Sequence, residues 1–190
     1  MSASYETLMT LLQVRRSCRE FAPHRLEEDV LASLEAAFAQ APQAGGDRHL
    51  ACHFITDSAR LHKLAEAGTQ AFADFCDRIP SAFAREEMRQ YGENFFWFGN
   101  APALAVVTCR KPPAFLQAVM GDKAALPWGG DLSGAMAAFA LLLAAQTLGL
   151  GACCLTGPLT VWREMETRLD IPKHDQLVLL VVIGYKKDSI

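Results

Sequence analysis

The pattern of apolar and polar positions predicts several amphipathic helices in the first half of the chain. Leu8, Leu11 and Leu12 share one helical face, and Ser4 can cap the start of that helix. The same spacing recurs between residues 27 and 39. We expect further helices over two stretches that repeat this pattern, 61–75 and 82–91.

Three short apolar stretches are typical of β-strands. They are CHFIT (52–56), PALAVVTC (102–109) and LVLLVVIG (177–184). The last is apolar at every position, as expected of a strand that is covered on both faces. The sequence therefore predicts one domain over residues 1–190, in which helices lie on both sides of a central sheet.

The segment from residue 132 to residue 162 contains no charged residue and is longer than a bilayer requires. A membrane helix and a buried core helix are both possible interpretations. Gln146 and Thr147 interrupt the apolar run, and Gly149 with Gly151 is typical of a helix stop followed by a short strand. We therefore expect a helix over 133–148 that the core or a partner subunit buries on all sides.

The overall charge argues against polyanionic partners. The chain of 190 residues has a formal net charge of −3, so we expect no binding to nucleic acid or to a membrane surface. Its first residues, MSASYETLM, lack the basic and then apolar regions of a secretion signal. These features predict a cytoplasmic protein.

The cysteines do not form a recognisable metal or disulfide pattern. The chain has 6 cysteines, without a CxxC motif and without histidines at ligand spacing. We interpret them mainly as small buried apolar residues, although Cys18 has cationic neighbours that could make it reactive. The six are Cys18, Cys52, Cys76, Cys109, Cys153 and Cys154.

The most chemically distinctive motif is QVRRSCREF, residues 13–21. If one helix continues over residues 8–19, Arg15 and Arg19 share a face, and Pro23 ends the helix soon afterwards. Guanidinium groups and a serine hydroxyl suit the oxygens of a phosphate. The alternative is a solvated basic helix end that the helix dipole stabilises.

Five segments in their order along the chain resemble the flavin-dependent nitroreductase family. They are RRSCREF (15–21), APQAGGDRHL (41–50), NAPALAVV (100–107), DLSGAMAAFALLLAAQTLGLGACCLTG (131–157) and VVIGY (181–185). The uncharged helix followed by LGLG is the most specific of them. The resemblance implies an α+β fold with a central mixed β-sheet covered by helices on both faces, and a homodimer that binds FMN at the subunit interface.

The resemblance also implies which residues contact FMN. Arg15, Ser17 and Arg19 match the residues that contact the ribityl phosphate and the polar edge of the flavin, and Arg16 matches a phosphate ligand. Thr156 and Gly157 match the backbone that approaches the flavin N5, where glycine allows close approach. The remaining candidates are Pro42, Gln43, Ala44, Gly46, Asn94, Lys186 and Lys187.

Two departures from the family pattern bear on these assignments. The first loop, with Gln43 and Gly46, is closer to a variant found in a subset that includes peptide azoline dehydrogenases. Relatives also continue into a tail that supplies a basic phosphate ligand, and here Lys186 and Lys187 are the available substitutes. An azoline-oxidising dehydrogenase is therefore kept as an alternative function.

The resemblance implies that the flavin carries the chemistry, so no catalytic side chain is expected. NADH or NADPH reduces FMN, which passes hydride to a nitroaromatic, a quinone or a related small electrophile in alternation at one pocket. A flavin-binding protein without catalytic activity is the other alternative. The aromatic residues Phe95, Phe96, Trp97, Phe98 and Trp128 are candidates for pocket walls or for core packing.

Overall fold

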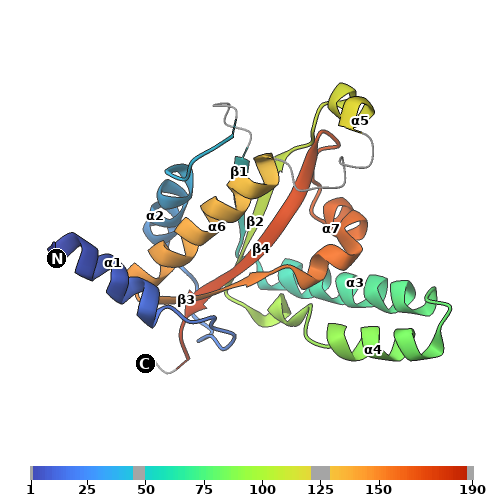
Figure 1. Ribbon diagram of the computed structural model, residues 1–190. Coiled ribbons are helices and arrows are strands. Elements are labelled where there is room, and N and C mark those ends of the chain that lie inside the picture. The colour runs from blue at the N-terminus through green and yellow to red at the C-terminus, as the bar shows by residue number, and fades with distance from the viewer. Residues whose placement is uncertain (1, 45–49, 121–128, 188–190) are drawn as a thin grey trace.

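The computed structural model describes residues 2–44, 50–120 and 129–187. Its centre is a four-stranded sheet with the order β1-β2-β4-β3, in which each neighbouring pair is antiparallel (Figure 1). The strands are β1 (Leu50–Ile55), β2 (Ala103–Arg110), β3 (Leu150–Leu155) and β4 (Asp175–Tyr185). β4 therefore lies in the interior of the sheet, next to β2 and β3.

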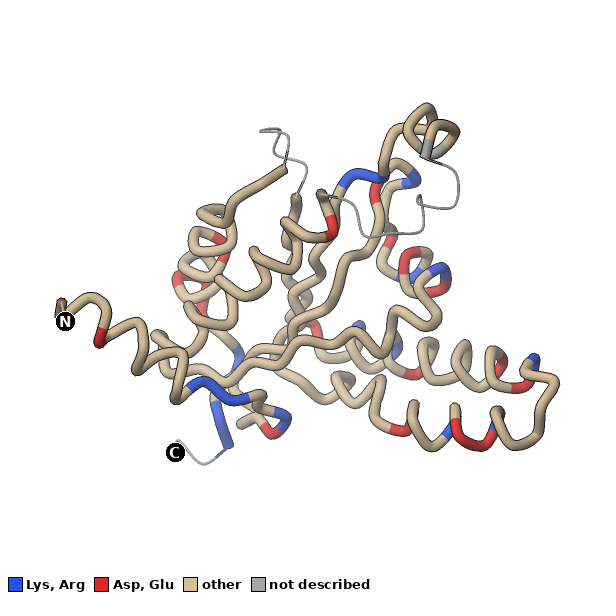
Figure 2. Tube along the Cα trace, in the orientation of Figure 1, with Lys and Arg blue, Asp and Glu red and all other residues tan. Residues whose placement is uncertain are grey.

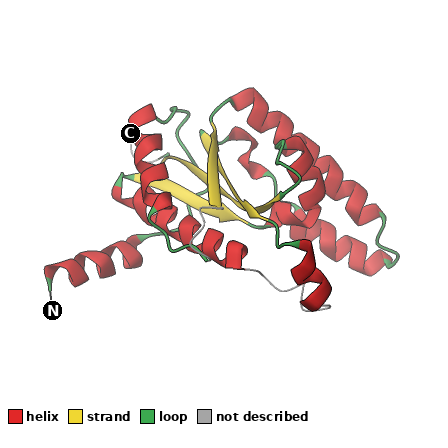
Figure 3. Ribbon diagram, turned by 90° about the horizontal axis from the view of Figure 1, so that it is seen from above, coloured by secondary structure: helices red, strands yellow, loops and turns green. Residues whose placement is uncertain are grey.

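Helices cover both faces of this sheet (Figure 3). The helical elements are α1 (Ala3–Val14), α2 (Glu28–Ala39), α3 (Ser58–Asp77), α4 (Ala82–Gly92), the 3-10 helix η1 (Trp97–Asn100), α5 (Ala114–Met120), α6 (Gly129–Thr147), the 3-10 helix η3 (Gly157–Val161) and α7 (Trp162–Arg168). α2 and α6 pack on one face, whereas α3, η1 and α7 pack on the other.

The alternation of side chains along β4 separates the core into two layers. Leu180 and Val182 face the cluster that α3 and α7 cover, while Val181 and Ile183 face the cluster beneath α2 and α6. All four side chains are completely buried. This confirms the prediction of a strand covered on both faces.

The prediction of a mixed sheet needs correction in one respect. The strand pairs in the described residues are antiparallel, and the single parallel pairing is an isolated bridge between Ser17 and Ala152. The segment that follows α1 makes this bridge along the free edge of β3. The α+β architecture with helices on both faces is otherwise as predicted.

α6 is buried on one side only within the chain, and burial of its other face by a partner subunit stays a prediction. Ala137, Leu141 and Ala145 are fully enclosed, but Met136 and Phe139 are each 45% exposed. α6 is the one helix in the described parts of the chain that is long and apolar enough to cross a membrane by length and composition. Its inner face packs against α2 and the sheet, as a core helix does.

Candidate functional site

The segment after α1 is fixed along the edge of the sheet. The backbone N–H of Cys18 donates to the carbonyl of Ala152 at 3.0 Å, and that of Ala22 donates to the carbonyl of Tyr185 at 2.8 Å. Phe21 also forms an antiparallel bridge with Lys186. The arginine motif near the N-terminus and the two lysines near residue 187 are thereby brought to the same corner of the molecule.

The helical arrangement expected for the arginine motif is wrong. α1 ends at Val14, and Arg15 is its C-cap with extended backbone angles (φ −60°, ψ 127°). Pairing with β3 replaces the last helical turns because it provides partners for backbone groups that a helix end would leave open. Alternate residues of an extended segment point to one side, which favours convergence of Arg15, Ser17 and Arg19.

Positive charge gathers where this segment meets the end of β4 (Figure 2). We name this cluster the basic corner, and it consists of Arg15, Arg16, Arg19, Lys186 and Lys187. Among the described residues one carboxylate, that of Glu20, pairs with it, through Lys187 at 3.4 Å. The basic corner therefore has a large excess of positive charge, which suits a multiply charged anion.

The five basic side chains differ in how many of their N–H donors already form hydrogen bonds within the chain. Arg16 donates to the carbonyls of Gln13 and Arg15 at 2.6 and 2.9 Å, and Lys186 donates to Oε1 of Gln146 at 3.4 Å. In the described parts of the chain, the side chains of Arg15 and Arg19 have neither an ion pair nor a hydrogen bond. These two guanidinium groups are therefore the most available to a ligand.

Gly151 lets the arginine segment lie close to β3. A Cβ atom at this position would lie 2.5 Å from Sγ of Cys18, which is too close for any side chain. The second glycine of LGLG thus has a packing role at the basic corner. This role is additional to the helix-stop interpretation of the motif.

Thr156 and Gly157 lie at the far end of β3 from the Ser17 bridge. Thr156 is exposed, and Gly157 begins η3. Four residues separate Ala152 from Thr156, which corresponds to about 13 Å at the rise of a strand. A Cβ at Gly157 would lie 2.3 Å from Cδ1 of Phe95, so contact with this ring is by itself sufficient reason for a glycine here.

The loop after α2 packs against the start of α6. The backbone N–H of Ala44 donates to Oγ of Ser133 at 2.9 Å. Next to it, Oε1 of Gln43 is buried and has no hydrogen-bond partner in the described part of the chain. A buried acceptor without a partner is costly, so this atom is suited to a donor from a ligand or from another chain. Pro42 is exposed beside it, and Gly46 lies outside the described residues.

This loop and the basic corner lie at opposite ends of α6 (Figure 1). Ser133 contacts the loop and Gln146 contacts Lys186, and these two residues, 13 positions apart, are separated by about 20 Å of helix. The structure therefore does not bring the two groups of candidate residues together within one chain.

The aromatic segment after α4 is divided between core and surface. Phe96 and Phe98 are buried in the core, as the packing interpretation predicted, whereas Asn94 is exposed in the preceding turn. The ring of Trp97 stacks on Phe21, with 6.3 Å between centroids. A cavity of about 300 Å³ next to this pair is also lined by Arg19, Asn100 and Lys187. Trp128 lies outside the described residues.

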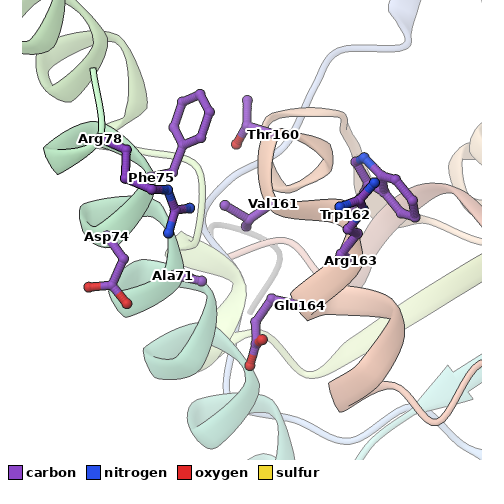
Figure 4. A pocket seen from close by; sticks show the side chains of 9 residues that line it. All are labelled: Ala71, Asp74, Phe75, Arg78, Thr160, Val161, Trp162, Arg163 and Glu164. Atoms are coloured by element: carbon purple, nitrogen blue, oxygen red, sulfur yellow. The ribbon is translucent and has the colours of Figure 1, made fainter. Parts of the chain in front are cut away.

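A second cavity, of about 400 Å³, was not predicted from the sequence (Figure 4). We name it the α3–α7 cavity. Its walls come from two segments more than 80 residues apart, so no local pattern could have identified it. It is lined by Ala71, Asp74, Phe75, Arg78, Thr160, Val161, Trp162, Arg163 and Glu164.

Several of the described cysteines are buried thiols, and none belongs to a metal site within the described ranges. All six are free thiols. Burial raises the pKa of Cys52 and of Cys109 to about 12, and that of Cys154 to about 11, so these thiols stay protonated near neutral pH. No group of three or more His, Cys, Asp or Glu side chains in the described ranges could hold a metal ion.

Comparison with known proteins gives a family and several similar folds. A sequence profile described as the Nitroreductase family matches residues 12–185. A search of curated protein sequences found no match. Among solved structures, a BluB-like flavoprotein from Clostridium difficile 630 is similar, with 20% identity, a TM-score of 0.80, and coverage of 96% of this chain and 91% of that chain.

Two further solved structures have the same fold. A nitroreductase with bound FMN from Bacteroides fragilis NCTC 9343 has 22% identity and a TM-score of 0.71, over 96% of this chain and 90% of that chain. An FMN-dependent nitroreductase from Clostridium difficile R20291 has 21% identity and a TM-score of 0.66, over 96% and 89%. At these identities the likeness establishes the architecture and leaves the chemistry to the residues.

Proposed function

Because the chain belongs to the nitroreductase family, we propose that it is an FMN-dependent oxidoreductase that uses NADH or NADPH to reduce a small electrophile. Nitroaromatics and quinones are the expected class of acceptor. The observation that carries the proposal is the basic corner, where five basic side chains gather and, in the described part of the chain, one carboxylate pairs with them. Two proteins of similar structure, a nitroreductase with bound FMN and an FMN-dependent nitroreductase, support the choice of flavin.

The residues of the chain fit a flavin mononucleotide in charge and in donor type. Arg15 and Arg19 offer guanidinium donors that are free of other partners, and Ser17 adds a hydroxyl next to them. Lys186 and Lys187 are the available substitutes for the basic phosphate ligand that the family resemblance implies. We assign the phosphate to these residues because forked cationic donors suit its oxygens.

The opposite end of β3 would face the redox-active ring. Thr156 and Gly157 lie about 13 Å from the basic corner along the strand. When bound, FMN would supply hydride transfer between NAD(P)H and the acceptor. The role of the protein is to bind and orient the flavin, and no side-chain nucleophile or metal ligand is required.

A second copy of the chain would complete the site. Gln43 and its loop lie about 20 Å from the basic corner of the same chain, measured along α6. A two-fold arrangement across the exposed face of α6 would place one end of this helix against the other end of its partner. The loop with Pro42, Gln43, Ala44 and Gly46 would then contact the flavin held by the partner, and the buried Oε1 of Gln43 would gain a donor.

The absorption spectrum of the purified protein tests this proposal first. We expect flavin bands in the visible region, release of FMN and not FAD on heating, and loss of the bands when NADH or NADPH is added without oxygen. A colourless protein that does not take up added FMN would overturn the proposal. A yellow protein that neither nucleotide reduces would instead support a non-catalytic flavin-binding role.

The acceptor test separates the remaining alternatives. An enzyme that is reduced by NAD(P)H and reoxidised by a nitroaromatic or a quinone is the expected result. Oxidation of an azoline to an azole without consumption of NAD(P)H would favour the dehydrogenase alternative. We propose a cytoplasmic location, with small molecules as substrates and without nucleic acid or membrane partners.

A further inference from the structure

The α3–α7 cavity combines apolar walls with charged groups at its rim. Ala71 and Phe75 line it from α3, and Val161 lines it from η3. Its volume of about 400 Å³ lies within the range of small-molecule sites, roughly 300–1,000 Å³. In Figure 4 the side chain of Arg78 extends toward the space between the two helices, whereas that of Arg163 lies beside Trp162 on the α7 side.

The two carboxylates of the cavity already have partners. Asp74 accepts a hydrogen bond from Nε2 of Gln70 at 2.9 Å. Glu164 forms an ion pair with Arg168 at 2.6 Å, and Arg168 lies outside the cavity. The two carboxylates therefore do not form ion pairs with the arginines that line the cavity.

The two arginines of the cavity are free to bind a ligand. Neither Arg78 nor Arg163 has a side-chain hydrogen bond or an ion pair in the described parts of the chain. The guanidinium of Arg163 lies over the ring of Trp162, at 5.1 Å from its centroid, which orients the group without using its N–H donors. With Arg168 included, the cavity has one positive charge in excess.

The α3–α7 cavity lies next to Gly157, whose backbone we propose to lie at the flavin ring. Oγ1 of Thr160, on the cavity wall, donates to the carbonyl of Gly157 at 2.8 Å. Three residues of a 3-10 helix correspond to about 6 Å, so the rim lies within the length of a small aromatic molecule from Gly157.

We propose that the α3–α7 cavity binds the carboxylate of a small aromatic acid, with Arg78 and Arg163 as the ligands of the anion. The apolar walls suit the ring of such a molecule, and one excess positive charge suits a monoanion better than a phosphate. The further step, that this acid is the electron acceptor, rests on the proposed function and on the closeness of the cavity to Gly157.

Two probes that share a ring and a nitro group but differ in charge test the binding site. Titration calorimetry on the protein as purified compares 4-nitrobenzoate with the neutral 4-nitrobenzamide. We expect the carboxylate to bind at least about tenfold more tightly, as charge-assisted hydrogen bonds to two partly solvated guanidinium groups would give. Equal affinity for the two probes would overturn the proposal.

Single substitutions assign the preference to the cavity. Arg78→Gln and Arg163→Gln should each reduce the preference for the carboxylate by about threefold or more, and Arg163→Lys should retain most of it because the charge remains. Arg60→Gln, on the same helix α3 but outside the cavity, is the matched control and should retain the full preference. If both glutamine variants still bind the carboxylate more tightly than the amide, the anion binds at another site.

Competition and turnover distinguish the possible sources of the anion. Inorganic phosphate should displace 4-nitrobenzoate only weakly, and displacement at lower concentration than by benzoate would overturn the assignment to a carboxylate. During turnover, the parent protein should have a higher KM for 4-nitrobenzamide than for 4-nitrobenzoate. In the glutamine variants the ratio of these two KM values should fall toward one. Tighter binding of the carboxylate than of the amide, without consumption of NAD(P)H, would contradict the proposed function but support the carboxylate site. Turnover of both probes without a difference in their affinities would contradict the carboxylate site alone.

Discussion

Arg15 and Arg19 are the residues at which the proposed function is most directly tested. If Arg19 binds the FMN phosphate, Arg19→Ala removes one or two charge-assisted hydrogen bonds, each worth roughly 1.5–3 kcal/mol. We expect the affinity for FMN to fall by about tenfold to several hundredfold, as measured by flavin fluorescence. Folding should persist because Arg19 is exposed.

Two controls isolate the phosphate contact. Riboflavin lacks the phosphate, so its affinity should change little in Arg19→Ala. Arg25→Ala removes an exposed arginine outside the basic corner and should leave FMN affinity near that of the parent. If Arg15→Ala and Arg19→Ala both stay within about twofold of the parent, the basic corner is a solvated cluster of charges that does not bind the FMN phosphate.

Cys109 predicts a specific dependence of stability on pH. Burial, reinforced by the nearby charge of Asp131, raises the pKa of Cys109 to about 12, whereas a thiol in the unfolded chain titrates near 8.5–9. Above about pH 9 the unfolded state loses this proton and the folded state retains it. The free energy of unfolding should therefore fall as pH rises toward 12, with Cys109 contributing about 1.4 kcal/mol per pH unit.

Urea denaturation between about pH 9.5 and 11.5 measures this contribution. Cys109→Ala should give a shallower decline than the parent by about that amount per pH unit, whatever its effect on stability at pH 7. Identical slopes in the two proteins would mean that this thiol titrates normally in the folded state.

At the scale of elements, the turn from α6 into β3 depends on Gly149. Its φ is +75°, in the left-handed region that L-residues other than glycine and asparagine avoid, and a Cβ there would have no atom within 4 Å. Gly149→Ala should lower the free energy of unfolding by about 1–2 kcal/mol through backbone strain alone, because no side chain would clash. Thermal or urea denaturation measures the effect.

An asparagine at the same position provides the matched comparison. Asn tolerates the left-handed conformation, so Gly149→Asn should be more stable than Gly149→Ala. The reverse order, or an alanine variant as stable as the parent, would argue that the turn does not require this backbone conformation. The test bears on the site because β3 connects the basic corner with Gly157.

For the whole molecule, the exposed apolar face of α6 predicts a homodimer. Phe139 and Met136 line an apolar hollow with Gln40, Ala41 and Pro42. Such a continuous apolar surface is unusual on a monomer. Phe139→Glu should shift the protein to a monomer at micromolar concentration in analytical ultracentrifugation, and FMN content should fall with it because each proposed site includes a loop from the partner.

Phe83 supplies the control for this substitution. It lies on α4, away from α6, and its side chain is 76% exposed. Phe83→Glu therefore makes the same change of charge and size without touching the proposed interface, and the dimer should persist. A parent protein that sediments as a monomer would contradict the dimer proposal outright.

The sequence by itself determined those features that depend on local periodicity and local chemistry. Residues 177–184 were predictable as a covered strand because they are apolar at every position, and the helix near 133–148 because glycines mark its end. The arginine motif was recognisable as a phosphate-binding candidate from its residue types. The family resemblance rested on the order of such segments, and the match over residues 12–185 confirmed it.

The tertiary structure decided everything that depends on contacts between distant segments. Pairing of Cys18 with Ala152 ended α1 at Val14, although the local pattern allowed the helix to continue through Arg19. The bridge between Phe21 and Lys186 brought Lys186 and Lys187 to the arginines, while α6 held Gln43 about 20 Å away. The α3–α7 cavity likewise exists only because two helices pack side by side. Local patterns specify the elements, but the partners available to each backbone group and each charge are set by the packing of the whole chain.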